Sequence, residues 1–202
     1  MTAFVRLSPA KHLRLVVIYP GVGYGSQEYV LKRMDEKVLP GIDEKALIVV
    51  APQNDTPWGE VVREIHQYAN AEGLSLTPAA LIGWSGGANG ITNALAEGHD
   101  FPSVLLADPS PVREAFSGPN TRVWYNPKNW KGSLAHLGPK QAQYAQPLGN
   151  RAILVQLDHN QILDEVIKIA LTERKATFPP ALLIGVPVFL IALALAIRAR
   201  RE

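Results

Sequence analysis

The segment that decides the fold reads Ala79-Ala80-Leu81-Ile82-Gly83-Trp84-Ser85-Gly86-Gly87, an apolar strand-like run that ends in the pattern Gly-x-Ser-x-Gly. Residues 88–90 are small and suit the start of a helix. A serine in so tight a turn from strand to helix has a strained backbone, and the flanking glycines avoid collisions with neighbouring elements. The pattern predicts an exposed Ser85 hydroxyl, with the Gly86 amide at the helix start facing any oxyanion that forms there.

Apolar runs of the same kind recur along the chain, at residues 13–19, 47–51, 79–84, 104–107 and 153–157. Stretches with helical spacing follow them, at residues 26–38, 58–71, 87–97 and 162–171. Continuous runs of this length are typical of strands buried on both faces, and the alternation of strand and helix indicates a parallel sheet covered by helices. With a weaker strand at residues 122–125, we expect an α/β fold with a mostly parallel sheet of about six strands.

Reactive side chains stand where three of these strands end. Ser85 and Asp108 directly follow their strands, and His159 comes two residues after the last one. Open parallel sheets bind ligands beyond the carboxyl ends of their strands, so these residues are the candidates for a functional site. Residues 126–150 are rich in Pro, Gly and Asn and predict mainly loop, with one short helix.

The strand, the Gly-x-Ser-x-Gly turn and the helix after it resemble the nucleophile turn of the α/β-hydrolase superfamily. The similarity in element order and spacing extends over about residues 13–171. No large cap domain fits between residues 97 and 104, so the chain looks like the compact, cap-less esterases, lipases and cutinases. The resemblance implies Ser85 as nucleophile and, in the superfamily's chain order of serine, acid and histidine, His159 as general base.

The acid of this implied triad is less clearly marked. The superfamily usually supplies it after the strand that corresponds to residues 122–125, but here Asn126-Pro127-Lys128-Asn129 follows without a carboxylate. Some lipases of the superfamily draw their acid from the preceding strand, which makes Asp108 the candidate. Asp108 is alternatively a turn cap, in which case Asn126 or Asn129 orients His159, as asparagine does in papain-like proteases.

A second oxyanion donor is expected in the loop after residues 13–19, which reads Pro20-Gly21-Val22-Gly23-Tyr24-Gly25-Ser26. Glycines let this backbone approach a substrate closely, so the amides of Val22 or Gly23 are the candidates beside Gly86. The same loop is a weak match to a nucleotide-binding turn, because its glycines give GxGxG and not GxGxxG, and no P-loop lysine follows.

Composition limits the classes of function. The 202 residues suit one catalytic domain plus an appendage, and Lys+Arg 20 against Asp+Glu 18 leaves a net charge of +2 that does not indicate a nucleic-acid partner. A cysteine count of 0 excludes a disulfide framework, a thiolate metal site and a cysteine nucleophile. The N-terminal residues lack the apolar core of a cleaved signal peptide.

The C-terminal part of the chain has a different character. Residues 181–197 carry no charge and, with the prolines of this segment, just reach the span of about 20 apolar residues that a bilayer core requires. We expect a domain at residues 1–172, a linker at 173–180, a single transmembrane helix at 181–197 and a basic tail at 198–202. The basic tail and the lack of an export signal point to opposite orientations, with a slight preference for a cytoplasm-facing domain.

Together these patterns predict a membrane-anchored serine hydrolase that cleaves an ester or related acyl bond through an acyl-enzyme on Ser85. It requires no cofactor and no metal, and a small-molecule or lipid-like ester is the expected substrate. The missing carboxylate after Tyr125 supports an alternative, a catalytically inactive hydrolase-fold protein that serves as a membrane-tethered binding or structural component.

Overall fold

The computed structural model describes residues 1–23 and 25–173, and these hold a seven-stranded sheet with the order β1-β3-β2-β4-β5-β6-β7. All neighbouring strands are parallel except β1 and β3, which are antiparallel. The expected mostly parallel α/β sheet is confirmed, with one strand more than expected. The strands are β1 (Ala3–Arg6), β2 (His12–Tyr19), β3 (Ala46–Val50), β4 (Ser75–Trp84), β5 (Val104–Ala107), β6 (Thr121–Tyr125) and β7 (Ala152–Leu154).

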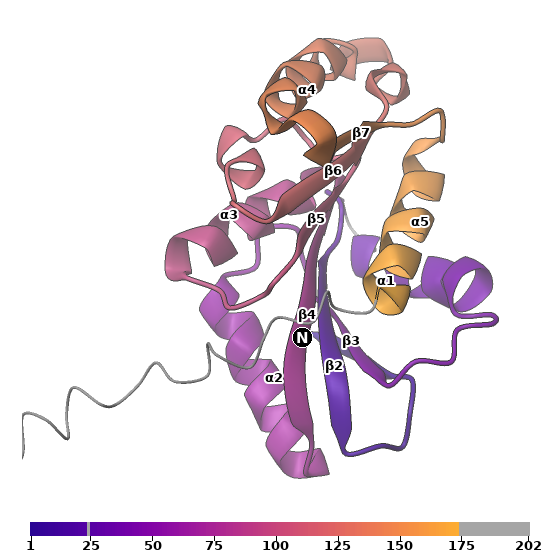
Figure 1. The fold of residues 1–202 in the computed structure, drawn as a ribbon, viewed down its shortest axis with the longest axis vertical. Helices are drawn as coiled ribbons and strands as arrows, with labels where there is room; N and C mark the ends of the chain where they lie inside the picture. Colours follow the sequence, from indigo (N-terminus) through magenta and orange to yellow (C-terminus); the bar gives the residue numbers. More distant parts are fainter. Residues whose placement is uncertain (24, 174–202) are drawn as a thin grey trace, which may run out of the picture. The chain divides into compact units, whose positions relative to one another are not determined.

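Helices cover both faces of this sheet (Figure 1). One face carries α2 (Trp58–Glu72) and α3 (Ala88–Glu97), and the opposite face carries α1 (Ser26–Arg33) and α5 (His159–Thr172). Another α-helix, α4 (Leu137–Ala145), belongs to the segment between β6 and β7. This three-layer arrangement is the one that alternating strands and helices predict.

Two apolar cores form because successive strand residues point to opposite faces. In β2, Val17 and Tyr19 join the core under α2 and α3, whereas Val16 and Ile18 join the core under α1 and α5, and all four are fully buried. Both faces of a central strand therefore need apolar side chains. This requirement explains why continuous apolar runs mark the strands in the sequence.

Two differences from the sequence prediction concern the sheet edges. Strand β1 was not expected; it has only four half-buried residues, and it forms by pairing with β3 in the register Ala3↔Val50. Strand β7 is shorter than the predicted run 153–157, because the chain leaves the sheet after the Val155 amide bonds to the Tyr125 carbonyl at 3.0 Å. The predicted helix 162–171 consequently begins earlier, at His159.

The C-terminal predictions concern residues that the structure does not describe. The chain divides into a compact unit, Met1–Thr172, and a second unit, Glu173–Glu202, of which only Glu173 is described. The predicted transmembrane helix at 181–197 and the basic tail at 198–202 lie outside the described residues, as does nearly all of the linker. Within residues 1–23 and 25–173, no helix is long and apolar enough to cross a membrane.

Candidate active site

Ser85 lies at the carboxyl end of β4, at the start of the short 3-10 turn Ser85–Gly87 that leads into α3. Its φ of 51° is in the left-handed region, which non-glycine residues adopt rarely and mainly at functional sites. Glycine is needed at position 87, because a Cβ there would collide with the carbonyl oxygen of Tyr19 in the adjacent strand. The turn is therefore tight, and the Ser85 side chain is only partly buried.

The loop between β2 and α1 passes directly over this turn. A Cβ placed on Gly86 would lie 3.1 Å from the backbone nitrogen of Val22 and would collide with the Val22 side chain. Gly86 and Val22, two of the predicted oxyanion donors, are thus neighbours beside Ser85. Gly23 is exposed, and a Cβ on it would meet nothing within 4 Å, so Val22 is the candidate that the fold brings to Gly86.

Asp108 and His159 meet although 51 residues separate them in the chain. The Nδ1 atom of His159 lies 2.7 Å from the Oδ2 atom of Asp108, which has no exposed surface. Asp108 follows β5 and has a φ of 43°, and His159 is the first residue of α5. Both residues come after the carboxyl ends of parallel strands, so their side chains lie at the same end of the sheet.

Several donors surround the Asp108 carboxylate. Besides His159, the described residues donate to it from Asn129 Nδ2 at 2.8 Å, from the Asn126 amide at 3.1 Å and from Gln141 Nε2 at 3.0 Å. Burial by itself raises the pKa of Asp108, but these hydrogen bonds outweigh it and hold the pKa below its ordinary value. Asp108 is therefore an anion at neutral pH, fixed in one orientation.

The two asparagines that the sequence offered as substitutes for Asp108 instead support it. Asn129 donates to Asp108 and also to the Leu157 carbonyl at 3.2 Å, while the Asn126 side chain donates to the same carbonyl at 3.0 Å. The Asn129 side chain, together with the backbone amide and the side chain of Asn126, thus ties the carboxylate to the chain just before His159. Asp108 also accepts a backbone amide, so the orienting contact and the turn cap that the sequence set against each other occur together.

Two residues of this site were not predicted from the sequence. Gln141 is fully buried on α4 and donates to both Asp108 and the Pro109 carbonyl, the latter at 2.8 Å. A signal for it exists, because a glutamine stands between Leu137 and Ala145 on the inward face of a short helix. Trp130 packs edge-on against the His159 ring, with ring centroids 5.8 Å apart, and a lone tryptophan in a loop gives no such signal.

Trp84 connects the serine turn to the histidine. Its ring centroid lies 5.1 Å from that of His159, and its indole nitrogen donates to the His159 carbonyl at 3.3 Å. Within the described part of the chain, no hydrogen bond joins the Ser85 hydroxyl to His159. Catalytic hydrogen bonds are often long in ligand-free enzymes and shorten when substrate binds.

The arrangement offers a hydroxyl in a strained turn, an imidazole fixed by a buried carboxylate, and backbone amides beside the hydroxyl. Such groups can deprotonate a nucleophile and stabilise an oxyanion. No cluster of three or more His, Cys, Asp or Glu side chains that could hold a metal ion occurs among residues 1–23 and 25–173.

The sheet order, the covering helices and the serine turn after β4 define the α/β-hydrolase fold, as the sequence pattern indicated. Poly(aspartic acid) hydrolase-1 from Sphingomonas sp. KT-1 is a similar solved structure, with a TM-score of 0.55 and 10% sequence identity over 81% of this chain and 89% of its own. A siderophore hydrolase from Aspergillus nidulans has a TM-score of 0.49 and 10% identity over 84% and 88% of the two chains. No protein-family model and no curated protein matches the sequence.

Proposed function

We propose that this protein is a serine hydrolase that cleaves an ester or related acyl bond through an acyl-enzyme on Ser85. The observation that carries the proposal is the pairing of a left-handed serine at the end of β4 with a histidine held by the buried Asp108 carboxylate at 2.7 Å. Strained serines and buried histidine–carboxylate pairs each have other uses, but a Ser-His-Asp triad on a parallel sheet uses both at the carboxyl ends of the strands.

In the proposed reaction, the Ser85 Oγ attacks the carbonyl carbon of the substrate and His159 Nε2 takes the serine proton. The carbonyl oxygen becomes an oxyanion, which the amides of Gly86 and Val22 stabilise. His159 then returns the proton to the leaving alcohol, and an acyl group remains on Ser85. Water repeats the sequence in the deacylation step and releases the acid.

Asp108 has the role of a positioning carboxylate in this reaction. It accepts the Nδ1–H of His159, which leaves Nε2 free to act as the base, and its negative charge stabilises the imidazolium that forms in the transition state. Support for an ionised Asp108 comes from its lowered pKa. Its donors Asn129 and Gln141 keep the carboxylate from turning away from the histidine.

The proposal is tested by labelling the folded protein with a fluorophosphonate probe, because such probes react with an activated serine and not with an ordinary one. We expect a single covalent adduct on the peptide that contains Ser85. Ser85→Ala should abolish labelling, and Ser110→Ala, a serine whose backbone amide binds the Ser85 carbonyl at 2.8 Å, should keep it. Labelling that persists in Ser85→Ala would contradict the mechanism.

A second candidate function is a hydrolase-fold protein without catalysis, serving as a binding or structural component. The observation in its favour is that the Ser85 hydroxyl makes no hydrogen bond to His159 within the described residues. This candidate predicts that folded wild-type protein resists the fluorophosphonate probe, so the same experiment decides between the two functions.

We also propose that residues 181–197 anchor the protein to a membrane. The support is their unbroken apolar composition, between the basic residues Arg174 and Lys175 on one side and Arg198 on the other. The full-length protein should stay with the membrane pellet after an alkaline carbonate wash, and the double variant Leu183→Arg, Leu190→Arg should be released. The matched variant Leu183→Ala, Leu190→Ala should stay bound, and release of the wild type would refute the anchor.

A further inference from the structure

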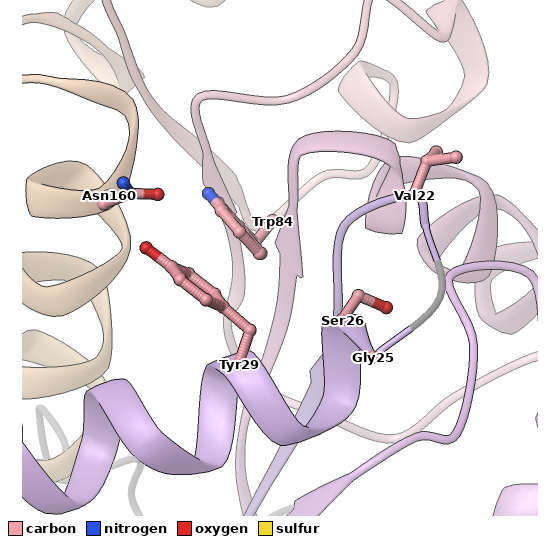
Figure 2. Close-up of a pocket in the computed structure, with 6 residues that line it drawn as sticks. All are labelled: Val22, Gly25, Ser26, Tyr29, Trp84 and Asn160. Carbon is pink, nitrogen blue, oxygen red and sulfur yellow. The ribbon is translucent and has the colours of Figure 1, made fainter.

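A pocket of about 440 Å³ opens beside the serine turn, on the face of the sheet that α1 and α5 cover. In Figure 2 the Tyr29 hydroxyl points toward the Asn160 amide, the Trp84 indole lies next to them, and Val22 stands across the pocket. The described residues that line it are Val22, Gly25, Ser26, Tyr29, Trp84 and Asn160. Its volume is within the range of about 300–1,000 Å³ that is usual for small-molecule sites.

Three walls of the pocket, Trp84, Asn160 and Val22, are each next in sequence or in space to a proposed catalytic group. Trp84 precedes the nucleophile Ser85, and Asn160 follows the base His159. Val22, the third wall, belongs to the loop whose amide lies against Gly86. A substrate held by Ser85 and by the oxyanion donors would therefore have one end at the mouth of this pocket.

A ring stack and an ion pair between α1 and α5 hold the aromatic part of the pocket in place. Tyr29 stacks on Trp84, with ring centroids 5.5 Å apart and an angle of 13° between the rings. One helical turn beyond Tyr29 and Asn160, Arg33 of α1 and Asp164 of α5 form a mostly buried ion pair that ties the two helices together. These contacts hold the aromatic side of the pocket, so a ligand that lies against Tyr29 and Trp84 does not require these two side chains to be ordered first.

The lining combines the aromatic rings of Tyr29 and Trp84 with the polar side chains of Ser26 and Asn160, and none of the six residues is charged. Glu28 of α1 has its carboxylate beside Gly25, whereas Arg33 pairs with Asp164 and the Asp158 carboxylate accepts the amides of Asn160 and Gln161. An anionic ligand group would lose its hydration there without gaining a counter-ion. The pocket therefore suits a group without negative charge that has a flat, apolar surface to lie against the rings of Tyr29 and Trp84.

We propose that this pocket binds the alcohol portion of the ester, with a preference for uncharged aromatic alcohols such as a benzyl group. The inference rests on the proposed function, in which His159 hands a proton to the leaving oxygen, so the alcohol lies on the histidine side of Ser85. Trp84, whose ring contacts His159, and Asn160, which follows it, put the pocket on that side. The acyl group then points the other way.

The test compares kcat/KM for benzyl butyrate and ethyl butyrate, two esters of the same acid whose alcohols have similar acidity. We expect wild type to prefer the benzyl ester and Tyr29→Ala to lower that preference by about tenfold, since an aromatic contact is worth a factor of this size. Tyr29→Phe should retain the preference because the ring remains. Tyr68→Ala is the matched control. Tyr68 does not line this pocket, and it also stacks on an aromatic ring, that of Phe4, with ring centroids 4.3 Å apart.

Further measurements separate the possible failures. If Tyr29→Ala leaves the benzyl preference unchanged, or lowers instead the preference for ethyl phenylacetate over ethyl butyrate, the assignment of the alcohol to this pocket is wrong. Binding of benzyl alcohol, followed by ligand-observed NMR, does not depend on catalysis. If the protein resists fluorophosphonate but binds benzyl alcohol, and Tyr29→Ala weakens that binding, the aromatic pocket is upheld and its catalytic use is overturned. If benzyl alcohol does not bind, the pocket itself is overturned.

Discussion

Ser85 and Asp108 are the two non-glycine residues with a positive φ in the described part of the chain, with values of 51° and 43°. Each follows a central strand, β4 or β5, so both lie at the carboxyl ends of the parallel strands. They differ in what holds them. The Ser85 turn is built from consecutive residues, whereas Asp108 is held by donors from the β6–β7 segment and from α5.

This difference determines which part of the site can be predicted from the sequence. A turn between a strand and a helix is specified by glycines a few positions apart, so the Gly-x-Ser-x-Gly pattern carries most of the information. The environment of a buried carboxylate is specified by residues far apart in the chain, and its energy depends on whether every partner is in place. Substitutions at the two residues should accordingly have different consequences.

The largest effect is expected at the local turn. Ser85→Ala removes the nucleophile and should lower turnover of p-nitrophenyl esters by about 10⁴-fold or more, because only binding and oxyanion stabilisation remain. The thermal melting curve, followed by circular dichroism, should hardly change, since the hydroxyl is partly exposed and the replacement is small. Ser85→Ala with wild-type turnover would mean that the strained turn is structural.

Asp108→Asn tests the non-local half of the site. Loss of the charge removes the stabilisation of the imidazolium and should lower kcat by about 10⁴-fold, with little change in KM. Asp158→Asn is the matched control, because Asp158 is exposed and caps α5, a task that asparagine also performs. Near-normal turnover in Asp108→Asn would transfer the orienting role to Asn126, Asn129 or a backbone carbonyl.

The same contrast explains what could be predicted from the sequence. The parallel sheet, the serine turn and the position of His159 follow from apolar runs and from residues at strand ends, which are local features. Gln141 lies 33 residues from Asp108 on a helix within a Pro- and Gly-rich stretch, and no local rule connects the two. Strand β1 was missed for a similar reason, since its four residues become a strand only by pairing with β3.

A smaller effect is expected at Gln141, which acts on the site only through Asp108. Gln141→Leu removes one donor from the carboxylate and should lower the free energy of unfolding by about 1.5–3 kcal/mol, the usual range for a hydrogen bond to a charged group. A looser Asp108 should lower kcat by roughly tenfold without changing KM. The control is Gln143→Leu, an exposed residue on the same helix, measured by urea unfolding and by steady-state kinetics.

If Gln141→Leu destabilises the fold but leaves kcat unchanged, the contact belongs to the packing of α4 and not to the site. If Gln143→Leu has the same effect on kcat, the change is a general response of the helix. Either result would reduce the set of residues that hold Asp108 to Asn126, Asn129 and His159.

The smallest effect concerns pH. The pKa of Asp108 is lower in the folded protein than in the unfolded chain, where an aspartate titrates at about 4. Ionisation of Asp108 therefore contributes stability that is fully present above about pH 4 and is lost as the pH falls through the lowered folded-state pKa. The difference in unfolding free energy between wild type and Asp108→Asn should shrink as the pH is lowered from 6 through this window, and a difference that grows would contradict the lowered pKa.

The most direct test of the central claim is to observe the acyl-enzyme itself. Wild-type protein mixed with p-nitrophenyl butyrate and quenched in acid should show a mass increase of one butyryl group, located by peptide mapping on the segment that contains Ser85. The increase should appear together with a burst of p-nitrophenol and should be absent in Ser85→Ala. A butyryl group on another residue, or a burst that survives in Ser85→Ala, would contradict Ser85 as the nucleophile.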